Sequence, residues 1–360
     1  MKTSLCLTLD YELFGSGRGD VFQHIINPTN RLLDICTQHH IKLSIFFEVV
    51  EYWKLKETYE RGISMGYLSN PAIAMEEQIK RAFRLGHDVQ LHLHPQWIDA
   101  KYENEEWVLQ LDYWRLPEVP DQANETISMG LSELIGKGKH TLEAILQSEN
   151  PAYKCNILRA GGYNIDPSDR LLKVLKEHAF IADSSVYFGG KATGNLSKYD
   201  YSDISATKAY WYASANSLAK SNGISSEFLE LPIFAQNRQR IFKYDAVRIK
   251  AAMQNKVNSI EKFKNNSAKK SKWETLQFLL QQEALTWDFC LFSKGKMRSF
   301  LSAATKLQKR SEFLFHPFIL VGHPKDFYYP DALLYLVQQV KKREIAFYTL
   351  SELVAKIKQQ

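Results

Sequence analysis

The segment Leu7-Thr8-Leu9-Asp10-Tyr11-Glu12 is a short apolar run that ends in two carboxylates. It continues the segment Ser4–Asp10, which has the length and composition of a β-strand. Other short apolar segments follow along the chain, and longer amphipathic segments separate them. This alternation predicts a parallel α/β fold, because each strand is followed by a helix that can cover the sheet. About eight strands over this length fit a barrel better than an open sheet.

The expected elements can be placed by their periodicity and their flanking residues. The expected strands are Ser4–Asp10, Lys42–Glu48, Asp88–Leu93, Asn156–Arg159, Phe180–Asp183, Glu227–Phe234, Phe318–His323 and Ile345–Thr349. The expected helices are Asn30–Gln38, Glu76–Leu85, Ser128–Gln147, Pro167–His178, Asp245–Lys262, Trp273–Leu285, Lys296–Arg310 and Pro330–Lys342.

Three stretches interrupt this rhythm. Residues 96–124 are rich in Trp, Tyr and acidic residues, residues 188–226 are rich in Ser, Gly and Tyr, and residues 238–310 form a basic helical segment. In α/β barrels the long loops that carry function follow the strands. We therefore expect a single barrel domain over residues 1–360 with three insertions.

The composition is that of an ordinary globular protein, with 45% hydrophobic and 24% charged residues. No apolar run approaches the roughly 20 residues of a membrane span. The N-terminal segment has no apolar signal core, so we expect a cytoplasmic protein. The four cysteines are scattered without CxxC spacing. This favours buried reduced thiols over disulfides or cysteine zinc sites.

The charge is unevenly distributed. The chain carries a net charge of +6, yet residues 238–310 alone contain 17 basic and 5 acidic residues. That segment is therefore at +12 and the remainder at −6. It is either a solvated helical face or a surface for an anionic glycan or a membrane. No nucleic-acid-binding motif accompanies it, so a nucleic-acid partner is not expected.

Ionisable residues recur at the carboxyl ends of the expected strands, where α/β barrels hold their active sites. They are Asp10, His92, Arg159, Asp183 and His323. His87 precedes its strand and lies at the opposite end, where we expect it to be structural. This set of strand-end residues is the strongest functional signal in the sequence.

The spacing suggests a metal site. Asp10 and Glu12 are two residues apart, as are His92 and His94. Where the backbone is extended, residues two apart point to the same side. Two carboxylates and two imidazoles would then converge, which suits Zn²⁺ with one position left open for water. A lone strand-end histidine would more often be structural, but this combination favours a metal.

The residues resemble, in order, the motifs of the polysaccharide deacetylases of the NodB-homology type. The matching segments are Leu7–Glu12, Phe46-Phe47, Gly86–Pro95, Arg159–Tyr163, Asp183–Ser185, Leu231-Pro232, Val321–Pro324 and Phe347–Leu353. Together they span nearly the whole chain. The resemblance implies a distorted (β/α)7-8 barrel and a hydrolase that removes acetyl groups from N-acetylated sugars with a divalent metal.

By that resemblance Asp10 is the general base, His92 a metal ligand, Arg159 the partner that orients the base, and His323 the general acid. Asp183 would position the histidine. Two positions depart from the family pattern: Tyr11 stands where a second aspartate is usual, and Gln96 where a second histidine is usual. Glu12 and His94 are then the nearest replacement ligands.

The chemistry implied is metal-assisted hydrolysis of an acylated sugar or polysaccharide precursor, as in carbohydrate metabolism. A backbone amide near Tyr163 could hold the developing oxyanion. Trp97, beside the proposed ligands, could stack on a sugar. Two alternatives stay open: a catalytically impaired barrel that binds a glycan or a partner protein, and a related hydrolase of non-sugar C–N bonds or of glycosidic bonds.

Overall fold

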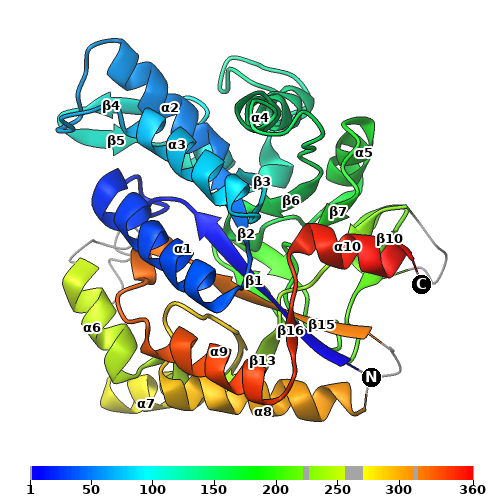
Figure 1. Ribbon diagram of the computed structural model, residues 1–360. Coiled ribbons are helices and arrows are strands. Elements are labelled where there is room, and N and C mark those ends of the chain that lie inside the picture. The colour runs from blue at the N-terminus through cyan, green and yellow to red at the C-terminus, as the bar shows by residue number, and fades with distance from the viewer. Residues whose placement is uncertain (1, 222–226, 256–270, 311–314, 360) are drawn as a thin grey trace.

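The computed structural model describes residues 2–221, 227–255, 271–310 and 315–359 (Figure 1). A curved sheet of parallel strands occupies the centre, and helices cover its outer surface. Within the described residues no helix is both long and apolar enough to cross a membrane. The four cysteines are buried and unpaired, as the sequence predicted.

The central sheet has ten strands, and seven parallel strands form the wall of the barrel. In spatial order they are β12 (Leu229–Glu230), β7 (Ala182–Asp183), β6 (Ile157–Ala160), β3 (Asp88–Leu93), β2 (Leu43–Glu48), β1 (Lys2–Tyr11) and β15 (Phe315–Gly322). The two ends meet where Ile233, just after β12, forms a parallel bridge with Ile319 of β15. A second bridge joins Asp288 to Val321. The sheet therefore closes into a distorted barrel, which confirms the predicted fold class.

The remaining elements cover the barrel or extend its loops. The helices are α1 (Asn27–His39), α2 (Val49–Glu60), α3 (Pro71–Arg84), α4 (Leu131–Leu146), α5 (Asp169–Glu177), α6 (Ala246–Asn255), α7 (Lys272–Leu280), α8 (Lys294–Gln308), α9 (Asp331–Lys342) and α10 (Leu350–Lys358). The other strands are β4 (Lys101–Glu103), β5 (Glu106–Val108), β8 (Lys191–Thr193), β9 (Lys198–Asp200), β10 (Trp211–Ser214), β11 (Ser217–Ser221), β13 (Ala235–Gln239), β14 (Gln282–Thr286) and β16 (Ala346–Phe347).

The two faces of β1 explain how the core and the site are divided. Leu5, Leu7 and Leu9 pack in the large cluster that includes apolar residues of the surrounding helices. Cys6 lies on the opposite face and packs in a second, smaller cluster inside the sheet. Because side chains alternate along a strand, Asp10 shares the inner face with Cys6. Strand β1 thus contributes apolar side chains to the core on both faces and a carboxylate, Asp10, at its carboxyl end.

Helix α10 closes the amino end of the barrel. Its apolar residues Leu350 and Leu353 join the inner cluster of the sheet. The N–H of Leu350 donates to Ser44 Oγ at 2.7 Å, and that of Ser351 donates to Asp88 Oδ2 at 3.1 Å. Ser44 and Asp88 lie at the amino ends of β2 and β3. These contacts anchor α10 across the amino ends of β2 and β3.

Three sequence-based assignments need correction. The helix expected over Trp273–Leu285 ends at Leu280, and Gln282–Thr286 is a strand, β14, that pairs with β13. Strand β14 is mostly part-exposed, with Leu285 its only buried residue, and its short length gave no clear period. Helix α2, which follows β2 without a loop, and helix α10 were both missed. The expected helix Asp245–Lys262 is seen as α6, and residues 256–262 lie outside the described residues.

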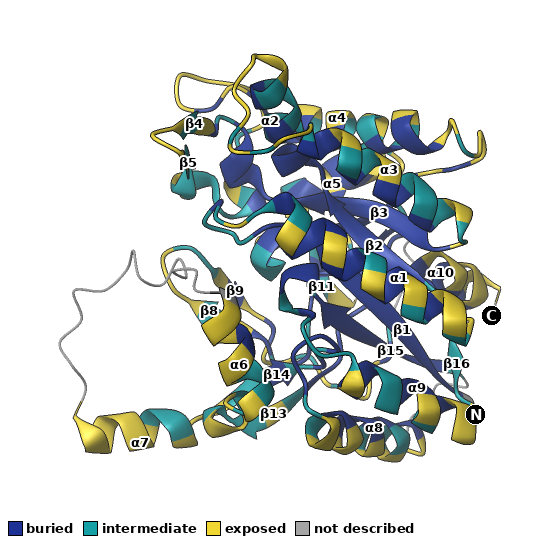
Figure 2. Ribbon diagram, turned by 60° about the vertical axis from the view of Figure 1, so that its left-hand side comes forward, coloured by how far each residue is buried: buried dark blue, intermediate teal, exposed yellow. Residues whose placement is uncertain are grey.

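Three insertions lie on the side of the barrel opposite the two chain termini (Figure 2). The hairpin β4–β5 follows β3, the hairpin β8–β9 follows β7, and the pair β13–β14 with α6 and α7 follows β12. Each insertion leaves the barrel from the carboxyl end of a parallel strand. All three therefore surround the end that carries the polar residues.

Candidate metal centre and acid–base pair

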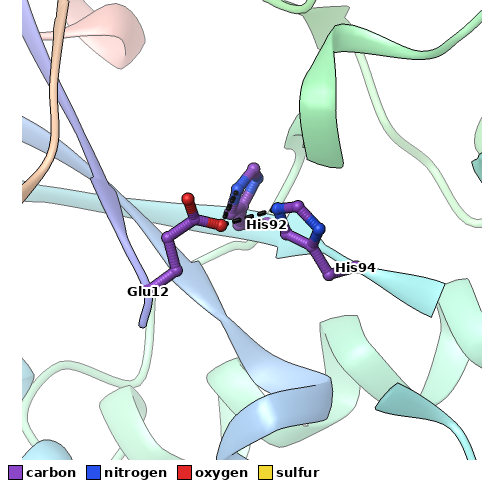
Figure 3. A group of neighbouring side chains, drawn as sticks. All are labelled: Glu12, His92 and His94. Carbon is purple, nitrogen blue, oxygen red and sulfur yellow. Dashed lines mark hydrogen bonds and ion pairs between the residues drawn. The ribbon is translucent and has the colours of Figure 1, made fainter. Parts of the chain in front are cut away.

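Glu12, His92 and His94 converge at the carboxyl ends of β1 and β3 (Figure 3). Glu12 Oε2 lies 3.2 Å from His92 Nε2 and 2.6 Å from His94 Nε2. The two imidazole rings meet edge to face, with centroids 4.9 Å apart. One ligand atom from each residue lies within 4.8 Å of the other two. Three of the four residues expected at the metal site are thus brought together.

The orientation of His92 suits a metal ligand. Its Nδ1 lies 2.8 Å from the main-chain oxygen of Arg159, to which it can only donate. A neutral imidazole that donates from Nδ1 carries its lone pair on Nε2, the atom that faces Glu12. Ligating histidines are commonly oriented by such a bond from the second nitrogen. His92 therefore presents a donor atom to the shared site.

Gln96 controls the second imidazole. Its side-chain amide lies 2.9 Å from His94 Nδ1, and in the described part of the chain its Oε1 has no hydrogen-bond partner. Gln96 is fully buried. Burial lowers the pKa of His94 and outweighs the opposing effect of Glu12, so this imidazole is neutral. The amide nitrogen of Gln96 is the end that faces Nδ1, so Nδ1 accepts its hydrogen bond and the proton of the neutral ring lies on Nε2.

Lys325 supplies the positive charge next to this cluster. Its Nζ lies 2.7 Å from Glu12 Oε1 and 2.6 Å from the main-chain oxygen of Leu13. Burial alone would raise the pKa of Glu12, but Lys325, His94 and His92 outweigh it and hold the pKa well below its usual range. Glu12 is therefore ionised, with Oε1 on the ammonium group and Oε2 facing the imidazoles.

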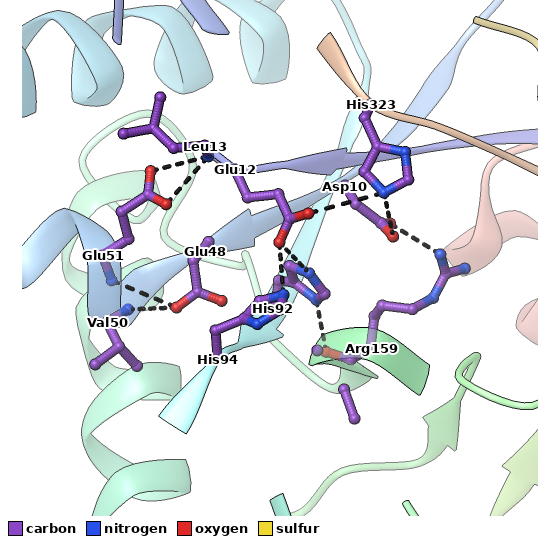
Figure 4. Close-up of polar contacts among 12 residues, drawn as sticks. Asp10, Glu12, Leu13, Glu48, Val50, Glu51, His92, His94, Arg159 and His323 are labelled. Atoms are coloured by element: carbon purple, nitrogen blue, oxygen red, sulfur yellow. Dashed lines mark hydrogen bonds and ion pairs between the residues drawn. The ribbon is translucent and has the colours of Figure 1, made fainter. Parts of the chain in front are cut away.

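Asp10 belongs to a neighbouring group (Figure 4). Its Oδ1 accepts a hydrogen bond from Arg159 Nη1 at 2.8 Å, and its Oδ2 lies 3.7 Å from His323 Nε2. His323 is also 3.8 Å from Glu12 Oε1, so it lies between the two carboxylates. Its side chain is 20% exposed, against 3% for Asp10. Among these residues His323 is therefore the one most open to an incoming molecule.

The guanidinium group of Arg159 is held on several sides. Its Nη2 donates to Thr8 Oγ1 at 3.2 Å and to Ser184 Oγ at 3.0 Å. The group also lies 4.4 Å from the centre of the Phe46 ring. Arg159 is fully buried, so its charge needs the Asp10 carboxylate as a counter-ion. These contacts fix Asp10 in one orientation.

Two further carboxyl groups, which the sequence did not single out, lie beside Glu12. Glu48 accepts hydrogen bonds from the N–H groups of Val50 and Glu51 at the start of α2, and Glu51 accepts from the N–H of Leu13. Burial raises the pKa of both, that of Glu51 to about 8. Of the three carboxyl groups Glu12, Glu48 and Glu51, Glu12 is therefore the one whose pKa favours the ionised form. Only their position, Glu48 at the end of strand β2 and Glu51 just after it, could have indicated the two further groups.

Asp183 lies apart from this group. Its carboxylate accepts hydrogen bonds from the N–H and the hydroxyl of Ser185, at 2.7 and 2.9 Å. Burial raises its pKa to about 6, and Glu230 is a neighbouring carboxyl group. Across the described residues no hydrogen bond or ion pair joins Asp183 to Asp10 or to His323. The role of positioning His323 therefore stays a prediction.

The two expected substrate contacts have different surroundings. Trp97 is 1% exposed and packs edge-on against Trp107, so neither ring face is open to a sugar. Tyr163 lies near Asp10, and burial followed by this charge raises its pKa well above the usual value. Trp114, from the same insertion as Trp97, lies edge-on to His94 at 5.7 Å. It is the better candidate for a substrate contact, and the aromatic content of residues 96–124 was its only signal in the sequence.

The donor set fits a divalent ion. Two neutral imidazoles and one carboxylate are the ligands that catalytic zinc sites use, and three protein ligands leave a fourth position for water. His92 already donates from Nδ1, and a Gln96 amide turned over would bring its unpartnered Oε1 to His94 Nδ1, which could then carry the proton and free Nε2. Asp10 is occupied by Arg159 and stands outside the group of three.

Comparisons with known proteins give distant structural similarities. No protein-family model matches the chain, and no curated protein matches it. A provisionally assigned polysaccharide deacetylase from Mycobacterium smegmatis is 11% identical with a TM-score of 0.48, over 100% of this chain and 91% of that one. An allantoinase is 10% identical with a TM-score of 0.47, over 98% and 89%. A 4-alpha-glucanotransferase from Thermococcus litoralis is 10% identical with a TM-score of 0.46, over 98% of this chain and 38% of that one. The chain is thus similar to solved structures of the polysaccharide deacetylase type, whose motifs the sequence resembles, and to structures with other activities.

Proposed function

We propose that the protein is a metal-dependent hydrolase that removes an acyl group, an acetyl group in the simplest case, from an N-acetylated sugar or glycan precursor. One observation carries the proposal. Glu12, His92 and His94 form a ligand set directly beside the Asp10–Arg159 pair and His323. A metal site, a base and an acid are the parts that amide hydrolysis needs.

Asp10 is the general base in this proposal. Its carboxylate is buried and bonded on one oxygen only to Arg159, so Oδ2 is available to take a proton from the attacking water. The buried guanidinium group holds the carboxylate in one orientation. Arg159 therefore acts as a positioning residue for the base.

His323 is the general acid. Its Nε2 lies within 4 Å of carboxylate oxygens of both Asp10 and Glu12. Its partial exposure allows it to reach the leaving amine. Donation of a proton from Nε2 lets the sugar depart as a neutral amine.

Glu12, His92 and His94 would hold the ion, with zinc as our choice because of the two imidazoles. A divalent ion there would supply Lewis-acid polarisation of the acyl carbonyl and would acidify the attacking water. The N–H groups of the turn at Tyr163 are the candidate donors to the developing oxyanion. That turn follows β6 directly, next to Arg159.

A second candidate function is a non-catalytic barrel that binds a glycan or a partner protein. The ion pair between Lys325 and Glu12 favours it, because the ammonium group already neutralises one of the ligands. Tyr11 also supports this second candidate, because its hydroxyl donates a hydrogen bond to Gln78 and offers no ligand to the site.

Metal content and acetate release together test these functions. We expect the purified protein to take up about one Zn²⁺ per chain and to release acetate from N-acetylglucosamine oligosaccharides. His92→Ala should abolish both, whereas His140→Ala, a change of an exposed histidine on α4, should change neither. Full metal content in His92→Ala would refute the ligand set. A protein that takes up no metal but binds the oligosaccharide would support the second candidate.

A further inference from the structure

Large apolar side chains are concentrated on the surface of one insertion, the segment from β13 to β14 with α6 and α7, which we call the arm. Of the twelve large hydrophobic residues that are exposed in the described part of the chain, eight lie between residues 241 and 280. Scattered exposed hydrophobic residues are normal in proteins, but a concentration of this kind marks an interaction surface.

Helix α7 shows the pattern most clearly. Trp273, Leu276 and Leu280 are 67%, 43% and 46% exposed. Their spacing of three and four residues places them on one face of the helix. The helix is held from elsewhere: Phe278 is half-buried beneath Arg240, whose guanidinium group lies 4.2 Å from the ring centre. The apolar face of α7 is therefore turned away from the contact that anchors it.

Helix α6 and the turn before it continue the surface. Ile249 and Met253 are one helical turn apart and are 51% and 68% exposed. Phe242 and Tyr244 are more than half exposed as well. Aromatic and aliphatic side chains thus occur together, which is typical of elements that lie at the interface between water and a bilayer.

Positive charge accompanies these side chains. Residues 238–283 contain eleven basic and four acidic residues, a net charge of +7. Glu283 pairs with Arg240 and Lys243, and Asp245 with Lys296. Lys250 and Lys272 are exposed, and no ion pair of either occurs among the described residues. These two lysines are therefore available to an anionic partner.

We propose that the arm docks on an anionic lipid bilayer. Lysine is depleted in protein–protein interfaces, where apolar residues dominate the core, so this mixture is unlike a subunit contact. A soluble polyanion would use the charge but would leave Trp273 and Leu276 in water. A bilayer accounts for both, because its headgroups attract the lysines and its acyl boundary receives the apolar side chains.

The position of the arm gives the docking a direction. The arm leaves the barrel after β12, from the same end that carries Glu12 and His92 (Figure 2). Docking would therefore bring the carboxyl end of the barrel towards the membrane surface. The proposal does not rest on the hydrolytic function, and its test does not measure metal or activity.

Co-sedimentation with vesicles tests the proposal. We expect the full-length protein to bind vesicles of phosphatidylcholine with 30% phosphatidylglycerol (roughly a third anionic lipid) at low salt. Binding to pure phosphatidylcholine should be weak, and binding to the anionic vesicles should fall steeply with added salt. The triple variant Trp273→Ser/Leu276→Ser/Leu280→Ser should lose binding by more than about 100-fold. The double variant Lys250→Gln/Lys272→Gln should lose about 30-fold, since each basic side chain contributes about 5-fold.

Matched variants control for general effects. Leu68→Ser/Ile73→Ser removes exposed apolar side chains elsewhere, and Lys341→Gln/Lys342→Gln removes exposed charge on α9; both should bind as the wild type does. Absence of wild-type binding at low salt would overturn the proposal, as would unchanged binding of the triple variant. A wild-type dimer in sedimentation equilibrium that the triple variant turns into a monomer would instead identify the face as a subunit interface.

Discussion

The ammonium group of Lys325 joins the side chain of Glu12 to the main-chain oxygen of Leu13, at 2.7 and 2.6 Å. Lys325 is only 8% exposed, so it contributes a buried charge directly beside the three candidate ligands. It acts as the counter-ion of Glu12 where no metal is bound. A divalent ion at the site would share that role.

Lys325→Met should therefore destabilise the metal-free protein and make it more responsive to metal. Removing one partner of a buried ion pair costs about 3–5 kcal/mol. Zn²⁺ should raise the Tm of this variant by more than it raises that of the wild type, because the ion replaces the lost charge. Lys294→Met, which breaks an exposed pair with Asp331, is the control and should change little. Equal Tm increases in Lys325→Met and the wild type would contradict the counter-ion role. Differential scanning fluorimetry with and without Zn²⁺ measures the effect.

Gln96 should tune metal affinity through His94. In Gln96→Glu a carboxylate faces Nδ1 of His94, which then carries the proton and leaves Nε2 free as a donor atom. We expect about 10-fold tighter Zn²⁺ binding, at the lower end of what such supporting contacts contribute. Gln96→Leu, which removes the amide without supplying an acceptor for Nδ1, should not tighten binding. Chelator competition gives the affinity, and nitrogen chemical shifts of the imidazole report the tautomer. Gln23→Glu adds the same charge at an exposed position and should have no effect.

Asp10→Asn and His323→Ala should separate chemistry from metal binding. Each should lower acetate release by about 10²–10⁴-fold, the usual contribution of a general base or acid. Both variants should keep their metal, because Glu12, His92 and His94 form the ligand group without them. Loss of metal in Asp10→Asn would return Asp10 to the ligand set. Normal turnover in either variant would remove it from the mechanism.

The local pattern was enough to predict where the strand-end residues lie. Asp10 and Glu12 share a side of β1 because strand side chains alternate, and His92 and His94 follow the same rule at the end of β3. Parallel strands bring their carboxyl ends to one rim, so the meeting of Glu12 with the two histidines could be anticipated.

The contacts between distant segments could not be predicted in this way. Lys325 follows β15 and reaches Glu12 across the sheet, and nothing in its own neighbourhood indicates that partner. The contact of Arg159 with Asp10, which keeps Asp10 apart from the ligand group, was expected only from the family resemblance and not from the local pattern. Trp97 and Trp114 occur in one insertion, and only its folding decides which ring is buried against Trp107 and which lies beside His94.

The amino end of the barrel should make stability depend on pH through His87. This residue is 3% exposed, and its Nδ1 accepts a hydrogen bond from the N–H of Leu43 at 2.9 Å, so it must be neutral. Burial, together with Lys42 and Arg81, lowers its pKa to about 4.

In the unfolded chain a histidine titrates near 6.5, so between about pH 4 and 6.5 the unfolded state binds the extra proton. The stabilisation is complete above about pH 6.5 and is lost as the pH falls towards 4, by up to about 3 kcal/mol for this group. His87→Gln should therefore show a shallower decline in unfolding free energy between pH 7 and 4.5. Part of the decline should remain in this variant, because burial also lowers the pKa of His316 to about 4. Urea denaturation across this range measures both curves, with His140→Gln as the exposed control. A slope in His87→Gln equal to that of the wild type would show that His87 is not the group that titrates.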